Sequence, residues 1–218
     1  MYLLIWVIIM SYESCRPDQS RYLAHFTKCS SRESKRSAKD VFKKILSEKM
    51  IEAHTVPWTK GPAVCFTECP WASMTDHAKK YSSYGIGFTK EYIYRRGGNP
   101  VFYVRPEIYS KQEWDDSIIN YFTPFVPKYA LETTKAEIKR NGFGHDYLDY
   151  SHEREWRLLK NLDFDYADIS FLVVDKAEEI EEIVEVTQGG ISTDLILPMS
   201  TYKMIESLWP VHKINITL

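Results

Sequence analysis

The chain predicts an α+β fold with a mixed, mainly antiparallel sheet and flanking helices. Its 218 residues are 44% hydrophobic and 27% charged, the balance of an ordinary soluble globular protein. Short strand-like and helix-like segments follow one another without a regular βαβ order, and their connections are short. This length suits one domain or at most two small ones, and we expect residues 21–218 to form a single α+β domain.

The first half of the chain predicts helices between short strands. Residues 21–26 alternate as a strand does, and 63–67 (A-V-C-F-T) have the composition of a buried strand. Apolar residues recur at helical spacing over 40–49, where Asp40 is the expected N-cap. A second helix is expected over about 70–80, because a proline at its start suits the first helical turn.

The second half continues the mixed order, and 101–104 is the clearest strand of the chain. Further strands are expected at 51–53, 84–88, 155–159, 169–174, 191–197 and 211–218. Further helices are expected at 114–121, 131–140, 176–183 (a short acidic helix or turn) and 202–208. We expect one core sheet that contains the strands around His25, Phe66, Phe88, Tyr103, Trp156 and Leu172.

The N-terminal residues 1–20 predict a tail outside this domain. Residues 2–10 are almost wholly apolar, which leaves three interpretations: a buried strand, a weakly membrane-associating tail, or an over-called start with Met10 as initiator. The run falls short of the ~20 residues that span a bilayer, so we expect no stable membrane insertion and a cytoplasmic protein. The four cysteines are expected to be reduced thiols, and Cys65-x3-Cys69 lacks the second close pair of a zinc site, so we expect no metal.

Charge is unevenly distributed although the net charge is only −2. Residues 21–49, from Arg21 to Lys49, are strongly basic, and residues 163–185 are strongly acidic. Each run is typical of a solvated surface. The alternative is a cationic groove for nucleic acid or a phosphate-bearing ligand, together with an acidic surface for a partner protein.

Four short motifs carry side chains of the types that bind ligands or take part in catalysis. They are His25-Phe26-Thr27, Val64-Cys65-Phe66-Thr67-Glu68, the segment 81–90 (Y-S-S-Y-G-I-G-F-T-K) and the segment 152–157 (H-E-R-E-W-R). In a strand, Glu153, Glu155 and Arg157 would share one face. Because unpaired charges are costly to bury, this face predicts either a set of ion pairs or a site for a hydroxylated or cationic ligand.

The order of these motifs resembles the bacterial abortive-infection AbiGi family, described as the antitoxin component of phage-resistance systems. The resemblance covers about residues 22–185 and rests on H-F-T, V-C-F-T-E-x-P, Y-G-I-G-F-x-K, G-x-N-P-V-F-Y-V and E-R-E-W-R, in that order. It implies a protein of bacterial phage defence, within a toxin–antitoxin system.

The same order more distantly resembles the ADP-ribosyltransferase fold. That resemblance implies NAD as cofactor, with His25 on its ribose side, Tyr84 stacking on nicotinamide and Glu155 bonding the ribose 2′-hydroxyl. Glu153 would face the acceptor, and Thr27 and Arg157 would complete the cofactor-binding set. The three residues His25, Tyr84 and Glu155 should then line one cleft. The chain departs from the pattern because no Ser-Thr-Ser strand is present.

Two other functional classes remain open from the sequence. The protein could be a non-enzymatic antitoxin that binds and restrains a cognate toxin, with its acidic segment and surface aromatics as interface. It could also bind nucleic acid through the basic run from Arg21 to Lys49, which predicts affinity that falls steeply with salt.

Overall fold

The computed structural model describes residues 20–28, 36–68, 78–127 and 148–208, without the side chains of 205–208. The predicted segments 131–140 and 211–218, most of the helix expected over 70–80, and residues 1–19 lie outside these residues. The division into a tail (1–20) and a domain (21–218) therefore stays a prediction. Among the described residues, no helix has the length and apolar character that a bilayer crossing requires.

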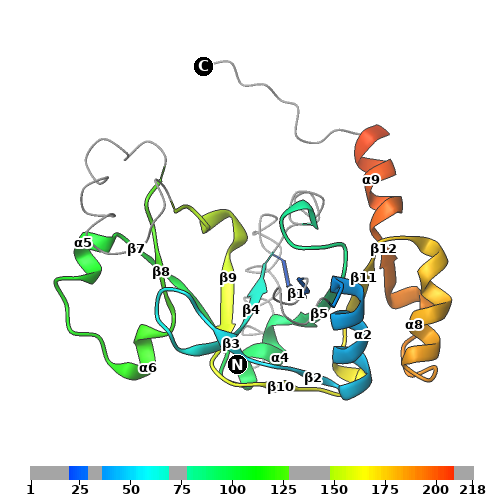
Figure 1. The fold of residues 1–218 in the computed structure, drawn as a ribbon, viewed down its shortest axis with the longest axis horizontal. Coiled ribbons are helices and arrows are strands. Elements are labelled where there is room, and N and C mark those ends of the chain that lie inside the picture. The colour runs from blue at the N-terminus through cyan, green and yellow to red at the C-terminus, as the bar shows by residue number, and fades with distance from the viewer. Residues whose placement is uncertain (1–19, 29–35, 69–77, 128–147, 209–218) are drawn as a thin grey trace, which may run out of the picture.

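A large sheet holds the fold together in the strand order β12-β11-β5-β1-β4-β9-β6, with β3 paired to β4 beside this path (Figure 1). Its strands are β1 (Tyr22–Phe26), β3 (His54–Thr55), β4 (Pro62–Thr67), β5 (Gly85–Thr89), β6 (Asn99–Pro100), β9 (Glu155–Leu158), β11 (Phe171–Val174) and β12 (Ile196–Pro198). Every pairing in it is antiparallel except β11 with β12. The predicted fold class, α+β with a mainly antiparallel sheet, is confirmed.

Two small sheets and the helices surround the large sheet. The small sheets pair β2 (Met50–Ile51) with β10 (Leu162–Asp163), and β7 (Phe102–Val104) with β8 (Phe122–Pro124). The helices are α2 (Ala38–Glu48), α4 (Lys90–Arg95), α5 (Pro106–Tyr109), α6 (Asp116–Ile119), α8 (Ile180–Val186) and α9 (Met199–Leu208). In Figure 1, β7, β8, α5 and α6 gather at one end of the sheet, and α2, α8 and α9 at the other.

Five of the six expected core strands lie in the large sheet, and the expectation for Tyr103 is wrong. Tyr103 belongs to β7, which pairs in parallel with β8 and not with the large sheet. The apolar alternation of 101–104 identified a strand but could not specify its partner, because pairing depends on distant residues.

The side of the sheet that faces α2 carries the main hydrophobic core. Strand residues such as Phe66 and Phe88 pack there with Phe42 and Leu46 of α2, and all four are at most 2% exposed. Burying each such side chain is worth about 1.5–3 kcal/mol. The opposite side has a smaller apolar cluster, in which Phe171 packs near Met199 of α9.

One local feature of α2 differs from the sequence expectation, and one feature of β5 explains a glycine. The N-cap of α2 is Ser37, whose hydroxyl accepts from the Asp40 backbone N–H at 3.1 Å, so Asp40 is the third helical residue of a capping box and not the cap. On β5, a side chain at Gly87 would meet the Phe171 ring at 2.3 Å. That glycine makes room for an aromatic ring.

Candidate functional site

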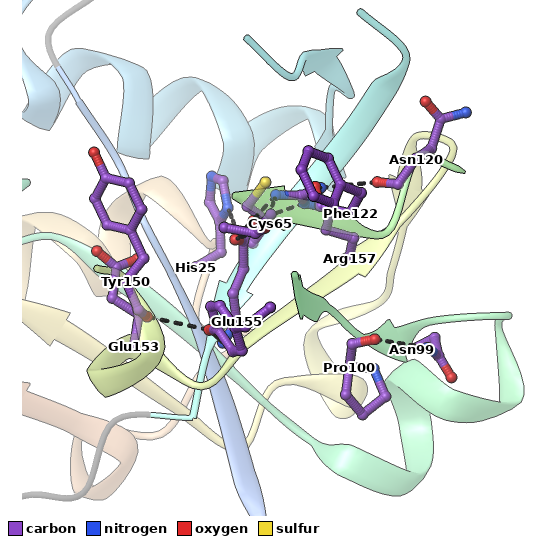
Figure 2. A network of polar contacts seen from close by, with 12 residues as sticks. His25, Cys65, Asn99, Pro100, Asn120, Phe122, Tyr150, Glu153, Glu155 and Arg157 are labelled. Carbon is purple, nitrogen blue, oxygen red and sulfur yellow. Dashed lines mark hydrogen bonds and ion pairs between the residues drawn. The ribbon is translucent and has the colours of Figure 1, made fainter. Parts of the chain in front are cut away.

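A buried arginine organises the polar side of the sheet at β9. The side chain of Arg157 is 1% exposed, and its five N–H donors are all used (Figure 2). Nε and one terminal nitrogen bind the two carboxylate oxygens of Glu155 at 2.8 and 3.1 Å. The other bonds go to the backbone oxygens of Asn120 and Phe122, both at 2.8 Å, and to the Thr123 hydroxyl at 2.7 Å. Arg157 therefore joins β9 to the β7–β8 end of the molecule.

Glu155 is held in one orientation by these contacts. Its carboxylate is 11% exposed, receives both N–H groups of Arg157, and accepts a weak bond from the Thr123 hydroxyl at 3.4 Å. Its backbone N–H donates to the Tyr103 hydroxyl at 3.0 Å, and that hydroxyl donates to the Tyr150 carbonyl oxygen at 3.1 Å. Both the main chain and the side chain at the start of β9 are thus fixed by neighbouring groups.

Glu153 lies in a turn before the strand, so the prediction that it shares a strand face with Glu155 is wrong. It ends a 3-10 turn (Ser151–Glu153), and Arg154 follows in the left-handed region at φ 45°. The buried Glu153 carboxylate pairs with Lys80 and accepts from the Tyr81 hydroxyl at 2.9 and 3.1 Å. Lys80 and Tyr81 also belong to this site. The sequence did not predict them as site residues, although Tyr81 is the first residue of the motif 81–90.

His25 lies where β1 and β4 separate. These strands share a single pair, Ala24 with Thr67, whereas β1 shares five with β5. The His25 Nδ1 is 2.8 Å from the Cys65 carbonyl oxygen, which can only accept, so Nδ1 carries the proton and Nε2 has a free lone pair. Burial is the main reason that the pKa of His25 is lowered, and nearby His54 lowers it further, against the carbonyl bond. His25 is therefore a neutral imidazole near pH 7.

Cys65 belongs to β4, the strand between β1 and β9. It lies on an inner strand of the sheet, yet its side chain is exposed. Surrounding protein atoms nevertheless desolvate the thiol and raise its pKa to about 12, and the neighbouring Glu155 carboxylate adds to this rise. We call the surface around this exposed side chain, with Glu155 and Arg157 of β9 beside it, the Cys65 recess. Its thiol stays protonated, which argues against a cysteine nucleophile.

Tyr84 and Thr27 do not face this recess, so the expectation that His25, Tyr84 and Glu155 line one cleft is wrong. Strand register places Glu155 opposite Thr67, and Thr67 opposite Ala24, on one side of the sheet. Tyr84 packs on Phe42 on the other side, and its hydroxyl donates to Glu179 at 2.9 Å.

Thr27 forms hydrogen bonds that link neighbouring segments. It is 2% exposed, and its hydroxyl donates to the Ala38 carbonyl oxygen at 3.0 Å. The Ser82 hydroxyl donates to the Thr27 carbonyl oxygen at 2.7 Å. These bonds tie the end of β1 to the start of α2, and they bury the hydroxyl that was expected to bind a cofactor.

The basic and acidic runs bind each other at the contact of α2 with α8. Lys39 pairs with Glu179 and Glu182 at 2.9 and 2.6 Å, and Lys43 pairs with Glu182 at 2.7 Å. The bonds to Lys39 and Lys43 lower the pKa of the Glu182 carboxyl. These lysines already have carboxylate partners, which weakens the interpretation of the basic run as a nucleic-acid groove and of the acidic run as a partner surface.

A family sequence model described as "Putative abortive phage resistance protein AbiGi, antitoxin" matches residues 25–186. The chain belongs to the AbiGi family. The resemblance seen in the sequence is thereby confirmed, and with it the assignment to abortive infection, in which an antitoxin family implies a toxin partner.

Solved structures of Thermus sp. 2.9 DarT are also similar to the chain. The complex with ADP-ribosylated ssDNA has a TM-score of 0.42 at 13% identity, covering 85% of this chain and 97% of that one. The complex with NAD+ has a TM-score of 0.38 at 14% identity, covering 81% and 97%. The complex with carba-NAD+ has a TM-score of 0.37, with the same identity and coverage. No curated protein matches the chain.

Proposed function

We propose that this AbiGi-family protein acts in phage defence by binding NAD in the Cys65 recess and transferring its ADP-ribose group. The observation that carries this proposal is the fixed carboxylate of Glu155 beside the recess, held by two N–H groups of Arg157. β4 lies between β9 and β1, and the strand register puts the Glu155 side chain on the same side of the sheet as Cys65 and Thr67.

The proposed reaction begins when the bond between ribose C1′ and nicotinamide breaks, and nicotinamide leaves with the electron pair. The ribose then carries oxocarbenium-like positive charge, which a preoriented carboxylate stabilises. Glu155 supplies that charge. The acceptor forms the new bond to C1′, and its proton passes to the Glu153 carboxylate. Arg157 acts as a positioning residue.

The variant Glu155→Gln tests this proposal. Glutamine keeps the shape but not the charge, so we expect NAD binding to persist and nicotinamide release to fall by about 100-fold or more. Melting temperature should also fall, because Arg157 loses its charged partner. Glu182→Gln removes an exposed carboxylate on α8 and serves as the matched control. Full nicotinamide release by Glu155→Gln, or failure of the wild type to bind NAD, would contradict the proposal.

A second candidate function is a non-enzymatic antitoxin that binds a toxin encoded beside it. The ion pair of Glu155 with the fully satisfied Arg157 favours it, because the same contacts are also those of a purely structural pair. Under this function Glu155→Gln lowers stability but leaves toxin neutralisation intact, and the wild type co-purifies with its partner. Measuring melting temperature, nicotinamide release and neutralisation on one variant separates the two candidates.

A further inference from the structure

Two lysines lie around the ring of Tyr81, beside the Cys65 recess. The ammonium of Lys28 is 4.0 Å from the centre of the Tyr81 ring, and that of Lys80 is 5.4 Å from it. Lys80 also lies 4.2 Å from the centre of the Tyr150 ring. Two cations from separate segments, after β1 and before β5, are thus brought to one aromatic surface.

The charges at this surface do not balance. Glu153 pairs with Lys80, and its carboxylate is 8% exposed. Lys28 forms no ion pair with the part of the chain that the structure describes, and its carboxylate neighbour Glu153 is already bound by Lys80 and Tyr81. Two ammonium groups therefore share one carboxylate and leave a surplus of one positive charge.

The surroundings of Lys28 make this surplus costly. Burial is the main reason that the pKa of Lys28 is lowered, and repulsion from Lys80 lowers it further, while Glu153 and Cys65 oppose the shift. Because Cys65 is among these neighbours, the Lys28 ammonium lies near the Cys65 recess. An anion that bridged Lys28 and Lys80 would relieve the repulsion and form charge-assisted hydrogen bonds with both.

We propose that Lys28 and Lys80 form a phosphate subsite of the Cys65 recess, with the rings of Tyr81 and Tyr150 as its walls. This inference rests on the proposed function and assigns the subsite to the diphosphate of an NAD-type dinucleotide. The phosphate of a nucleic-acid strand has the same chemistry and is the other source that the experiment must distinguish. Lys80 has a structural task in pairing with Glu153, so Lys28 is the residue to test.

The test compares three ligands by calorimetry with the full chain. ADP-ribose carries a diphosphate, nicotinamide riboside carries no phosphate, and a mixed-sequence single-stranded oligodeoxynucleotide carries the alternative phosphate. We expect Lys28→Gln to weaken ADP-ribose binding about 10-fold or more, the worth of one charge-assisted hydrogen bond, and to leave nicotinamide riboside binding unchanged. Lys28→Arg keeps the charge and should bind within about 3-fold of wild type.

Lys111→Gln is the matched control, because Lys111 is an exposed lysine in the turn after α5. Each variant is also checked by its melting temperature, which should not fall in Lys28→Gln because that change relieves the repulsion from Lys80. Equal ADP-ribose affinity of wild type and Lys28→Gln would overturn the subsite and leave the proposed function standing. Oligonucleotide binding that needs Lys28, without binding of NAD or ADP-ribose, would keep the phosphate subsite and overturn the proposed function. No binding of any phosphate ligand would overturn both.

Discussion

The two sides of the large sheet are built from different kinds of side chain. The side facing α2 is filled by aromatic and aliphatic residues such as Phe42, Phe66 and Phe88. The side at β9 holds a buried arginine with five hydrogen bonds and an exposed cysteine. On the first side the free energy of folding is spread over many contacts. On the second it depends on a few groups that must all be present.

The largest effect is expected from breaking the polar side at its centre. Arg157→Met should lower the free energy of unfolding by about 3–5 kcal/mol, because it leaves the Glu155 carboxylate and two backbone carbonyls without their partner. Urea unfolding measures this change. Arg95→Met is the control: Arg95 is 75% exposed and, among the residues that the structure describes, pairs with Glu91 four residues earlier, so its loss should cost less than about 0.5 kcal/mol. Equal stability of the two variants would show that the Arg157 network is not structural.

A smaller effect is expected from truncating one contact on the apolar side. Leu46→Ala should lower the free energy of unfolding by about 3 kcal/mol, since Leu46 is 0% exposed in the main core. The lost contacts lie on the side of the sheet away from the recess, so NAD affinity per folded molecule should not change. If fully folded Leu46→Ala lost much of its NAD affinity, the two sides of the large sheet would not be independent.

The sequence predicted the strands better than it predicted their partners. Alternating apolar residues located the strands around His25, Phe66, Phe88, Trp156 and Leu172, because that pattern is local. It could not show that Tyr103 lies in a separate sheet. The left-handed backbone of Arg154 separates Glu153 from the strand that begins at Glu155, and no glycine or asparagine signals it in the sequence.

The geometry around the predicted site residues differs from the expected cleft. Glu155 shares one side of the sheet with Thr67 and Ala24, whereas the rings of His25 and Tyr84 contact Phe66 and Phe42 of the main core on the other side. Deciding this requires the register through three strand pairings, from Glu155 to Thr67, to Ala24 and then to β5. The ion pairs between α2 and α8 were also not predicted, because the paired residues, such as Lys43 and Glu182, are 139 residues apart in the sequence. Long-range pairing of this kind leaves no local pattern.

The smallest effect concerns His25, at the border between the two sides. Its pKa in the folded state is below the ordinary 6.5, so on acidification the unfolded chain takes up a proton first. The contribution to stability is therefore complete above pH 6.5 and is lost as the pH falls below it. His25→Asn keeps a donor for the Cys65 carbonyl but cannot titrate, and should show a smaller loss of stability between pH 7.5 and 5.5 than wild type.

Denaturant midpoints measured across this pH range test the prediction. The carboxyls of Glu179 and Glu182, whose pKa values are lowered from 4.5, titrate below the window and do not interfere. His152→Asn is the control, because the His152 side chain is 64% exposed and solvated in both states. If wild type and His25→Asn lose stability equally, His25 is not buried as a neutral imidazole.

The strand order has a consequence for how the protein is made. The inner strands β1, β4 and β5 lie within residues 22–89, but their outer neighbours β9 and β11 begin at residues 155 and 171. At about 5–20 residues per second, a ribosome needs roughly 3–13 s to pass from the end of β5 to the start of β9. During that interval the nascent chain has the free edges of β4 and β5 without their final partners. Open edges of this kind pair readily with other chains, so synthesis of this protein should depend on chaperones that shield them until β9 and β11 emerge.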